Sequence, residues 1–156
     1  AGEVLGMDGI SAETHHCDAI ALEDSEVCLI PFNQLESVSL KVPTLQRHLH
    51  RVLSREIVRD QGMMMMLGAM RAEERVIAFL LNLSQRYIAR GYAAADFNLR
   101  MTREEIGSYL GLKLETVSRA FSHLQEEGLV QVEKKRIRLM DTAKLKKLLS
   151  HDDASR

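Results

Sequence analysis

Three polar residues, Glu115, Ser118 and Arg119, lie close together in the stretch Leu114–Gln125. At helical spacing they share one face of that stretch. An arginine can bind guanine through two parallel hydrogen bonds, a carboxylate can accept one from the cytosine amino group, and a serine hydroxyl suits several base edges. Glu115 and Arg119 are i, i+4 neighbours, so one can orient the other. The pattern indicates a helix that reads base edges, and the alternative is a solvated helix face with a surface ion pair.

A second short helix should precede this one and hold it in place. Thr102 and Glu105 have the spacing of a capping box at its start. Gly107 has no side chain and would let the following helix pack closely over it. Gly111 stands where the helix must end in a left-handed conformation, which glycine adopts easily. The later helix, which Gly128 should end, has an apolar face made of Leu114, Val117, Phe121 and Leu124.

A β-hairpin should follow the two helices. The runs Leu129–Val132 and Arg136–Met140 alternate or are apolar, and the charged turn Glu133-Lys134-Lys135 separates them. A helix-turn-helix followed by a basic-tipped hairpin is a winged helix, whose second helix enters the DNA major groove. We expect a further set of residues to hold phosphates and fix the register: Thr102, Lys113, Thr116, Lys134, Lys135 and Arg136.

The run IGSYLGLKLETVSRAFSHLQEEGLV resembles the DNA-binding segment of the Crp/Fnr transcription regulators, and Glu115-Thr116-Val117-Ser118-Arg119 matches the Fnr-type E-x-x-S-R pattern. The likeness covers nearly the whole chain. Gly2–Gly6 and Ser25–Phe32 resemble the end of the family's β-roll, and Arg51–Ile57 resembles its dimer helix. Fnr/Anr-type oxygen-responsive members are the most similar. Lys113 departs from the family, because a Thr or Ser N-cap is usual there, and lysine cannot accept from the free amides.

The resemblance implies binding to duplex DNA as a homodimer, at a palindrome close to TTGAT-N4-ATCAA. Glu115 and Arg119 would contact its central G·C pair, and Ser118 would discriminate near the outer T. It also implies contact with RNA polymerase, for which Tyr87, Tyr92 and Ala93 are candidates by position alone.

The two cysteines, Cys17 and Cys28, invite a metal interpretation. Taken from the residues alone, Cys28 in an apolar strand should be buried and inert, and no paired spacing supports zinc. The resemblance places Cys28 where Fnr-type sensors supply the fourth thiolate of a 4Fe–4S cluster, the other three coming from a segment absent from this sequence. We therefore expect no cofactor in this fragment but an oxygen-responsive cluster in the intact protein. The alternative is a regulator with another effector or none.

A long helix is predicted from Pro43 to about Leu67. One of its stripes, Leu45, Leu49, Val52 and Met63, should face its own subunit. The other has the 3–4 spacing of a dimer seam and consists of His50, Leu53, Ile57, Asp60 and Met64. We favour a parallel two-fold dimer, and the alternative is one broad buried face in a monomer. Asp60 would meet its own copy across the seam and weaken the dimer.

The predicted fold is mainly α with a small β content. Residues 1–42 should be the remnant of a β-roll sensor, 43–68 the dimerisation helix, 69–142 the winged helix-turn-helix domain, and 143–156 a helix and a polar tail. Shorter elements are predicted too: a hairpin of Asp18–Leu22 and Val27–Phe32, a helix from an Asn33 cap to Lys41, a helix Arg71–Arg90, a strand Asn98–Met101, a helix Ala143–Leu149 and a disordered tail from His151.

Composition narrows the class of protein. The net charge of −1 hides an asymmetry, because residues 1–40 hold eight carboxylates and no Lys or Arg, while the rest is basic. No apolar run is long enough to span a membrane and no signal peptide is present, so the cytoplasm is the expected location. No nucleophile–base pair or glycine-rich phosphate loop indicates an enzyme. The remaining alternative to DNA binding is a winged helix that binds protein.

Overall fold

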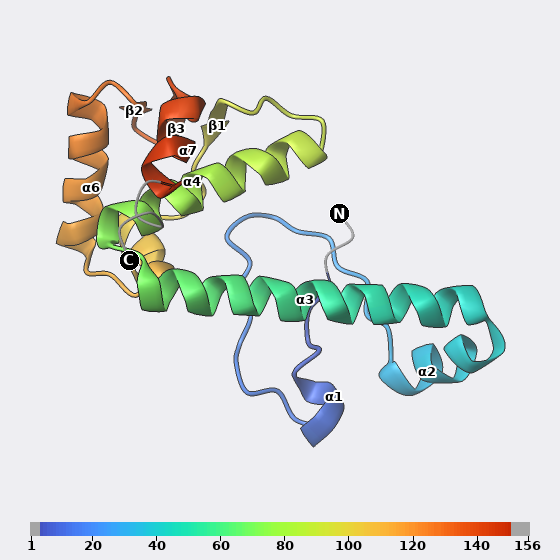
Figure 1. Ribbon diagram of the computed structural model, residues 1–156. Helices are drawn as coiled ribbons and strands as arrows, with labels where there is room; N and C mark the ends of the chain where they lie inside the picture. Colours follow the sequence, from blue (N-terminus) through green and yellow to red (C-terminus); the bar gives the residue numbers. More distant parts are fainter. Residues whose placement is uncertain (1–3, 151–156) are drawn as a thin grey trace. The chain divides into compact units, whose positions relative to one another are not determined.

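The computed structural model describes residues 4–150 (Figure 1). The chain forms two compact units, residues 1–63 and 64–156, and the division between them falls inside one helix, α3 (Pro43–Ala69). The last turns of this helix therefore belong to the second unit.

The first unit holds α1 (Gly9–Ala12), α2 (Phe32–Lys41) and most of α3. The predicted helix ending at Lys41 is confirmed, but its cap is wrong: Pro31 is the N-cap, and Asn33 lies inside the helix, where its Oδ1 accepts from the Gln34 amide at 2.8 Å. Pro43 opens α3 as predicted, because a proline at the first helical position loses no hydrogen bond.

The predicted hairpin of residues 18–22 and 27–32 is wrong. Between Glu13 and Pro31 the chain has neither helix nor strand. The apolar side chains of the predicted hairpin are exposed to solvent: Ile20 is 84% exposed, Val27 80% and Leu29 94%. An isolated pair of strands is marginal in water, and nothing in the described part of this chain covers these side chains.

The two predicted stripes of α3 differ in exposure. Leu45, Leu49, Val52 and Met63 are each partly buried. Of the five seam residues only Leu53 is partly buried, whereas His50, Ile57, Asp60 and Met64 are exposed. The helix thus presents an exposed, partly apolar face along the seam.

The second unit is a helical domain with a small sheet (Figure 1). Its elements, after the end of α3, are α4 (Ala72–Ala89), β1 (Asp96–Asn98), α5 (Arg103–Leu110), α6 (Leu114–Glu126), β2 (Val130–Glu133), β3 (Arg136–Leu139) and α7 (Thr142–Ser150). Its core gathers fully buried side chains from α4, α5, α6, β3 and α7: Val76, Ile77, Leu80, Ile106, Leu110, Val117, Leu124, Ile137 and Leu145.

The sheet has the order β1-β3-β2, with both pairings antiparallel. Ile137 on the central strand lies opposite Phe97 on one side and Val132 on the other. The predicted hairpin after α6 is therefore confirmed. The strand predicted at residues 98–101 is displaced: it covers Asp96–Asn98, which brings Phe97 into the core opposite Ile137. The helices predicted at Arg71–Arg90 and Ala143–Leu149 are confirmed as α4 and α7, and the predicted tail from His151 lies outside the described residues.

Candidate nucleic-acid interface

The first helix of the motif, α5, begins with the predicted capping box. The Glu105 amide donates to Thr102 Oγ1 at 3.2 Å, and the Thr102 amide donates to Glu105 Oε2 at 2.6 Å. The hydrogen bond from the Thr102 amide lowers the pKa of the Glu105 carboxyl. The Thr102 hydroxyl, predicted to hold a phosphate, is thus in use as a helix cap.

The turn between α5 and α6 depends on two glycines. Gly111 has a φ of 62°, the left-handed region that ends the helix as predicted. At Gly107 a Cβ atom would lie 2.5 Å from the Leu112 carbonyl oxygen, and the Leu112 amide donates to the Gly107 carbonyl at 2.8 Å. Gly107 therefore lets the chain return over α5 at a distance that no other residue permits.

The second helix, α6, buries Val117, Ala120, Phe121 and Leu124. Leu114, predicted on that face, is 45% exposed. The structure places the three predicted base-reading residues on the accessible part of α6: Glu115 and Arg119 are exposed and Ser118 is half-buried.

The amino end of α6 is open. Lys113 is the N-cap residue and makes no side-chain capping bond, as its type predicts, while its carbonyl accepts from the Thr116 and Val117 amides at 3.0 and 3.1 Å. Free amides and the positive end of the helix dipole make such a terminus suitable for an anion. Lys113 is exposed, and Thr116 is half-buried one turn further on.

Lys134 and Lys135 form the turn of the β2–β3 hairpin, and both are exposed. Lys134 has a φ of 56°. An L-residue with a Cβ pays about 1–2 kcal/mol for this left-handed conformation. A glycine would adopt this conformation at a lower cost, but a lysine keeps a positive charge at the tip of the wing.

Arg136, predicted to hold a phosphate, is engaged inside the wing. Its Nε and Nη2 each lie 2.7 Å from a carboxylate oxygen of Asp96, and Arg138 Nε reaches the same carboxylate at 3.3 Å. Arg138 also donates to Gln131 at 3.0 Å. The hydrogen bonds from Arg136 lower the pKa of Asp96 to about 2, and the same pair raises the pKa of Arg136. This network links all three strands on the exposed side of the sheet.

The network predicts a pH-dependent stability. The folded-state pKa of Asp96 is below its unfolded value, so its contribution is complete above about pH 4 and is lost as the pH falls toward about 2. In thermal melts Asp96→Asn should be less stable than the wild type at neutral pH, and the difference should shrink across that window. A difference in melting temperature that stays constant from pH 7 to pH 2 would contradict this role of Asp96.

Other polar residues of the interface are also occupied. His123 Nδ1 lies 2.7 Å from Glu73 Oε2, which ties α6 to α4. Of the candidates for RNA polymerase contact, Tyr87 stacks on Phe97 with ring centroids 5.1 Å apart, whereas Tyr92 and Ala93 are exposed.

Arg103 was not among the residues predicted from the sequence. Its guanidinium carbon lies 3.3 Å from the ring centroid of Phe121, which joins α5 to α6, and burial lowers the pKa of this arginine. Its position in the first turn of α5 was a signal in the sequence. A cation there interacts unfavourably with the helix dipole, which suggests that the residue is present for another reason.

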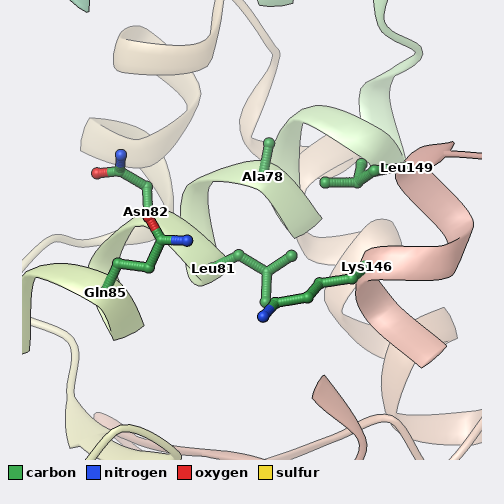
Figure 2. A pocket seen from close by; sticks show the side chains of 6 residues that line it. All are labelled: Ala78, Leu81, Asn82, Gln85, Lys146 and Leu149. Carbon is green, nitrogen blue, oxygen red and sulfur yellow. The ribbon is translucent and has the colours of Figure 1, made fainter. Parts of the chain in front are cut away.

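An open hollow of about 340 Å³ lies between α4 and α7. Figure 2 shows the six side chains that line it: Ala78, Leu81, Asn82, Gln85, Lys146 and Leu149. This lining contains one charged side chain and no pair of groups suited to acid–base chemistry.

Cys17 and Cys28 are free and exposed, so the expectation that Cys28 is buried in a strand is wrong. Among residues 4–150 no three His, Cys, Asp or Glu side chains come together as a metal site. Two cysteines cannot supply the four thiolates of a cubane cluster, so the residues of this chain do not by themselves fit that group. None of the helices in the described part combines the length and apolar character that crossing a bilayer needs.

Comparison with known proteins agrees with this geometry. Residues 74–148 match the family described as the Crp-like helix-turn-helix domain. The chain is 51% identical over 151 residues to the transcriptional regulatory protein btr of Bordetella pertussis, covering 97% of this chain and 62% of that protein. It is 47% identical over 143 residues to the transcriptional activator protein anr of Pseudomonas aeruginosa, covering 92% of this chain and 59% of that protein. The chain thus spans about three-fifths of the length of these relatives.

Solved structures give the same result for the fold. FixK2 from Bradyrhizobium japonicum matches with a TM-score of 0.69 at 34% identity, over 74% of this chain and 57% of that one. A transcriptional regulator of the CRP/FNR family from Thermus thermophilus matches with a TM-score of 0.58 at 25% identity, over 69% of this chain and 55% of that one. The chain therefore belongs to the Crp/Fnr family, with a Crp-like helix-turn-helix domain at residues 74–148.

Proposed function

We propose that this chain is the DNA-binding part of a transcription regulator that reads a palindrome close to TTGAT-N4-ATCAA as a homodimer. The observation that carries the proposal is the accessible face of α6. Glu115 and Arg119 are exposed on a helix whose opposite face is packed in the core, and the helix begins at an uncapped terminus. These are the features that a recognition helix needs in a major groove.

Within this proposal Glu115, Ser118 and Arg119 read bases, while Lys113, Thr116, Lys134 and Lys135 hold phosphates. The last four residues lie at the amino end of α6 and at the tip of the wing. Thr102 is less available to a phosphate than the other four, because its hydroxyl accepts from the Glu105 amide and its own amide donates to Glu105 Oε2. Arg136 acts by holding the wing through Asp96.

The test is binding of the chain to a duplex carrying the palindrome, compared with a scrambled duplex, over a series of salt concentrations. We expect a clear preference for the palindrome and a loss of affinity with salt whose slope corresponds to several phosphates. A winged helix that binds protein instead would show no preference between the two duplexes and only a shallow salt dependence.

Lys134→Gly should separate stability from DNA binding. Glycine relieves the left-handed strain at this position, so the free energy of unfolding should rise by up to about 1 kcal/mol. The same change removes one phosphate contact, so the salt slope of DNA binding should fall by about 1. Denaturant melts and salt titrations measure the two effects.

Lys135→Gly is the matched control, because Lys135 has the same charge without a positive φ. It should lower the salt slope similarly and gain no stability. Equal changes in the free energy of unfolding for the two variants would contradict the claim that the positive φ of Lys134 costs stability.

The exposed seam of α3 supports the dimer proposed above. In a two-fold pair Asp60 would lie near its own copy, and two carboxylates at short range repel each other. We expect Asp60→Ala to tighten self-association about tenfold, the equivalent of ~1.4 kcal/mol. Sedimentation equilibrium measures this, with Asp8→Ala, outside α3, as the control. An unchanged dimer affinity for Asp60→Ala would remove Asp60 from the seam.

Control by oxygen in the intact protein is supported by the names of relatives, such as the anaerobic regulatory protein of Pasteurella multocida, which is 46% identical over 144 residues. We propose that Cys28, which is exposed, contributes one thiolate to a 4Fe–4S cluster whose other ligands lie outside this chain. A cytoplasmic location and contact with RNA polymerase through exposed residues such as Tyr92 follow from the same proposal, and no enzymatic step is part of it.

A further inference from the structure

Arg75, in the first turns of α4, binds three main-chain carbonyl oxygens at once. Its Nε donates to Met70 at 3.0 Å, its Nη1 to Leu110 at 3.1 Å and its Nη2 to Leu67 at 2.7 Å. Leu67 is in the last turn of α3, Met70 follows that helix directly, and Leu110 is the last residue of α5. One guanidinium therefore joins the end of α3 to the first helix of the helix-turn-helix.

These carbonyls need a donor from outside their own helices. The last carbonyls of any helix lack an intrahelical partner and carry the negative end of the helix dipole. The amide that could reach the Leu67 carbonyl belongs to Arg71, but it donates to Glu74 Oε2 at 2.7 Å instead. Arg75 caps the ends of two helices that converge on it. Its planar guanidinium has several N–H donors that can reach separate carbonyls, whereas a lysine has a single ammonium group.

Packing at the same place agrees with the hydrogen bonds. A Cβ atom built on Gly111 would lie 3.6 Å from Leu67 Cδ2 and 3.7 Å from Arg75 Nη1, so both side chains lie against the turn between α5 and α6. Met66, one residue before Leu67, is buried. The compact second unit begins at Met64. The end of α3 is therefore built into the helix-turn-helix unit.

We propose that Arg75 is a positioning residue that fixes the direction in which α3 leaves the helix-turn-helix, and thereby the distance between the two α6 helices of the dimer. This inference rests on the proposed function, in which α3 pairs and α6 enters the major groove. Arg75 touches no base in it; it sets which spacing between half-sites the dimer accepts.

The first test uses the full chain and duplexes in which the spacer between the half-sites is shortened or lengthened by one or two base pairs. The wild type should prefer one spacing by about a hundredfold, because simultaneous engagement of both half-sites depends on geometry. Arg75→Met should reduce that preference to about tenfold or less and keep the preference for cognate over scrambled half-sites. Arg75→Lys, which keeps the charge without the fork, should behave more like Arg75→Met than like the wild type.

The second test is amide hydrogen exchange, which needs neither DNA nor a dimer. The Met70 amide, which donates to the Met66 carbonyl at 3.1 Å, reports the end of α3, and the Val117 amide at 3.1 Å from the Lys113 carbonyl reports α6. In Arg75→Met the Met70 amide should exchange at least about tenfold faster, with Val117 unchanged. Arg59→Met, which breaks the exposed pair of Arg59 with Glu56, is the matched control and should change neither.

The outcomes separate the two proposals. A wild type that ignores the palindrome overturns the proposed function, and the exchange experiment then still decides whether Arg75 holds the end of α3. If the wild type selects one spacing, two results would overturn the positioning role alone. One is an Arg75→Met variant with the same spacing preference as the wild type. The other is an equal acceleration of hydrogen exchange at the Met70 and Val117 amides in that variant.

Discussion

Gly107→Ala should destabilise the second unit by about 3 kcal/mol, at the upper end of what overpacking costs. The added Cβ atom would lie 2.5 Å from the Leu112 carbonyl oxygen and 3.5 Å from its carbon. This obstacle is main chain, which cannot rotate away as a flexible side chain can. The turn between α5 and α6 must move as a whole, which also displaces the start of α6. Denaturant unfolding followed by circular dichroism measures the loss.

Gly68→Ala is the matched control for this prediction. Gly68 is also in a helix of the second unit, and a Cβ atom there would meet nothing within 4 Å. Alanine should gain up to about 1 kcal/mol there from its higher helix propensity. A similar effect of the two variants would mean that the close approach at Gly107 does not determine the packing of the two helices.

Arg119→Ala should weaken binding to the cognate palindrome by about 1–3 kcal/mol and leave binding to scrambled DNA nearly unchanged. Arg119 is exposed on α6 and lies one turn after Glu115, which can orient it. Its expected contribution is a pair of parallel hydrogen bonds to one guanine. Competitive binding with the two duplexes at one salt concentration measures the difference.

Arg119→Lys tests whether geometry or charge matters. Lysine keeps the positive charge but lacks the planar fork, so most of the specificity should be lost while the salt slope is retained. Equal losses on cognate and scrambled DNA in Arg119→Ala would assign this residue to the phosphate backbone instead.

The sequence was most informative where the determining contacts are local. Thr102 and Glu105 of the capping box are three positions apart, and Gly107 and Gly111 act on the turn that directly follows α5. Such features depend on residue type and spacing alone. They predict the order of the two helices, and the alternating runs on either side of Glu133-Lys134-Lys135 predict the wing, which is why the second unit could be predicted closely.

The remaining features depend on residues far apart in the sequence. Arg136 meets Asp96 across 40 residues, His123 meets Glu73 across 50, and Arg75 meets Leu110 across 35. No spacing rule connects such pairs, because the fold itself brings them together. Arg136 was accordingly predicted as a phosphate ligand, although the sheet holds it against Asp96.

The predicted hairpin before α2 failed for a different reason. Alternating apolar residues favour a strand only where a second layer covers one face. In residues 13–31 the apolar side chains are exposed, so the pattern alone did not produce a sheet. The periodicity of apolar residues indicates which face a segment would bury, but it does not indicate whether another element is present to cover that face.

The division inside α3 has a practical consequence for anyone who wishes to express the helix-turn-helix unit alone. A cut at the visible end of the helix, after Ala69, would remove Met66 from the core and the Leu67 carbonyl from its donor. A shortened gene should begin upstream of Met64, so that the second unit keeps the last turns of α3, which secondary structure alone would assign to the first unit.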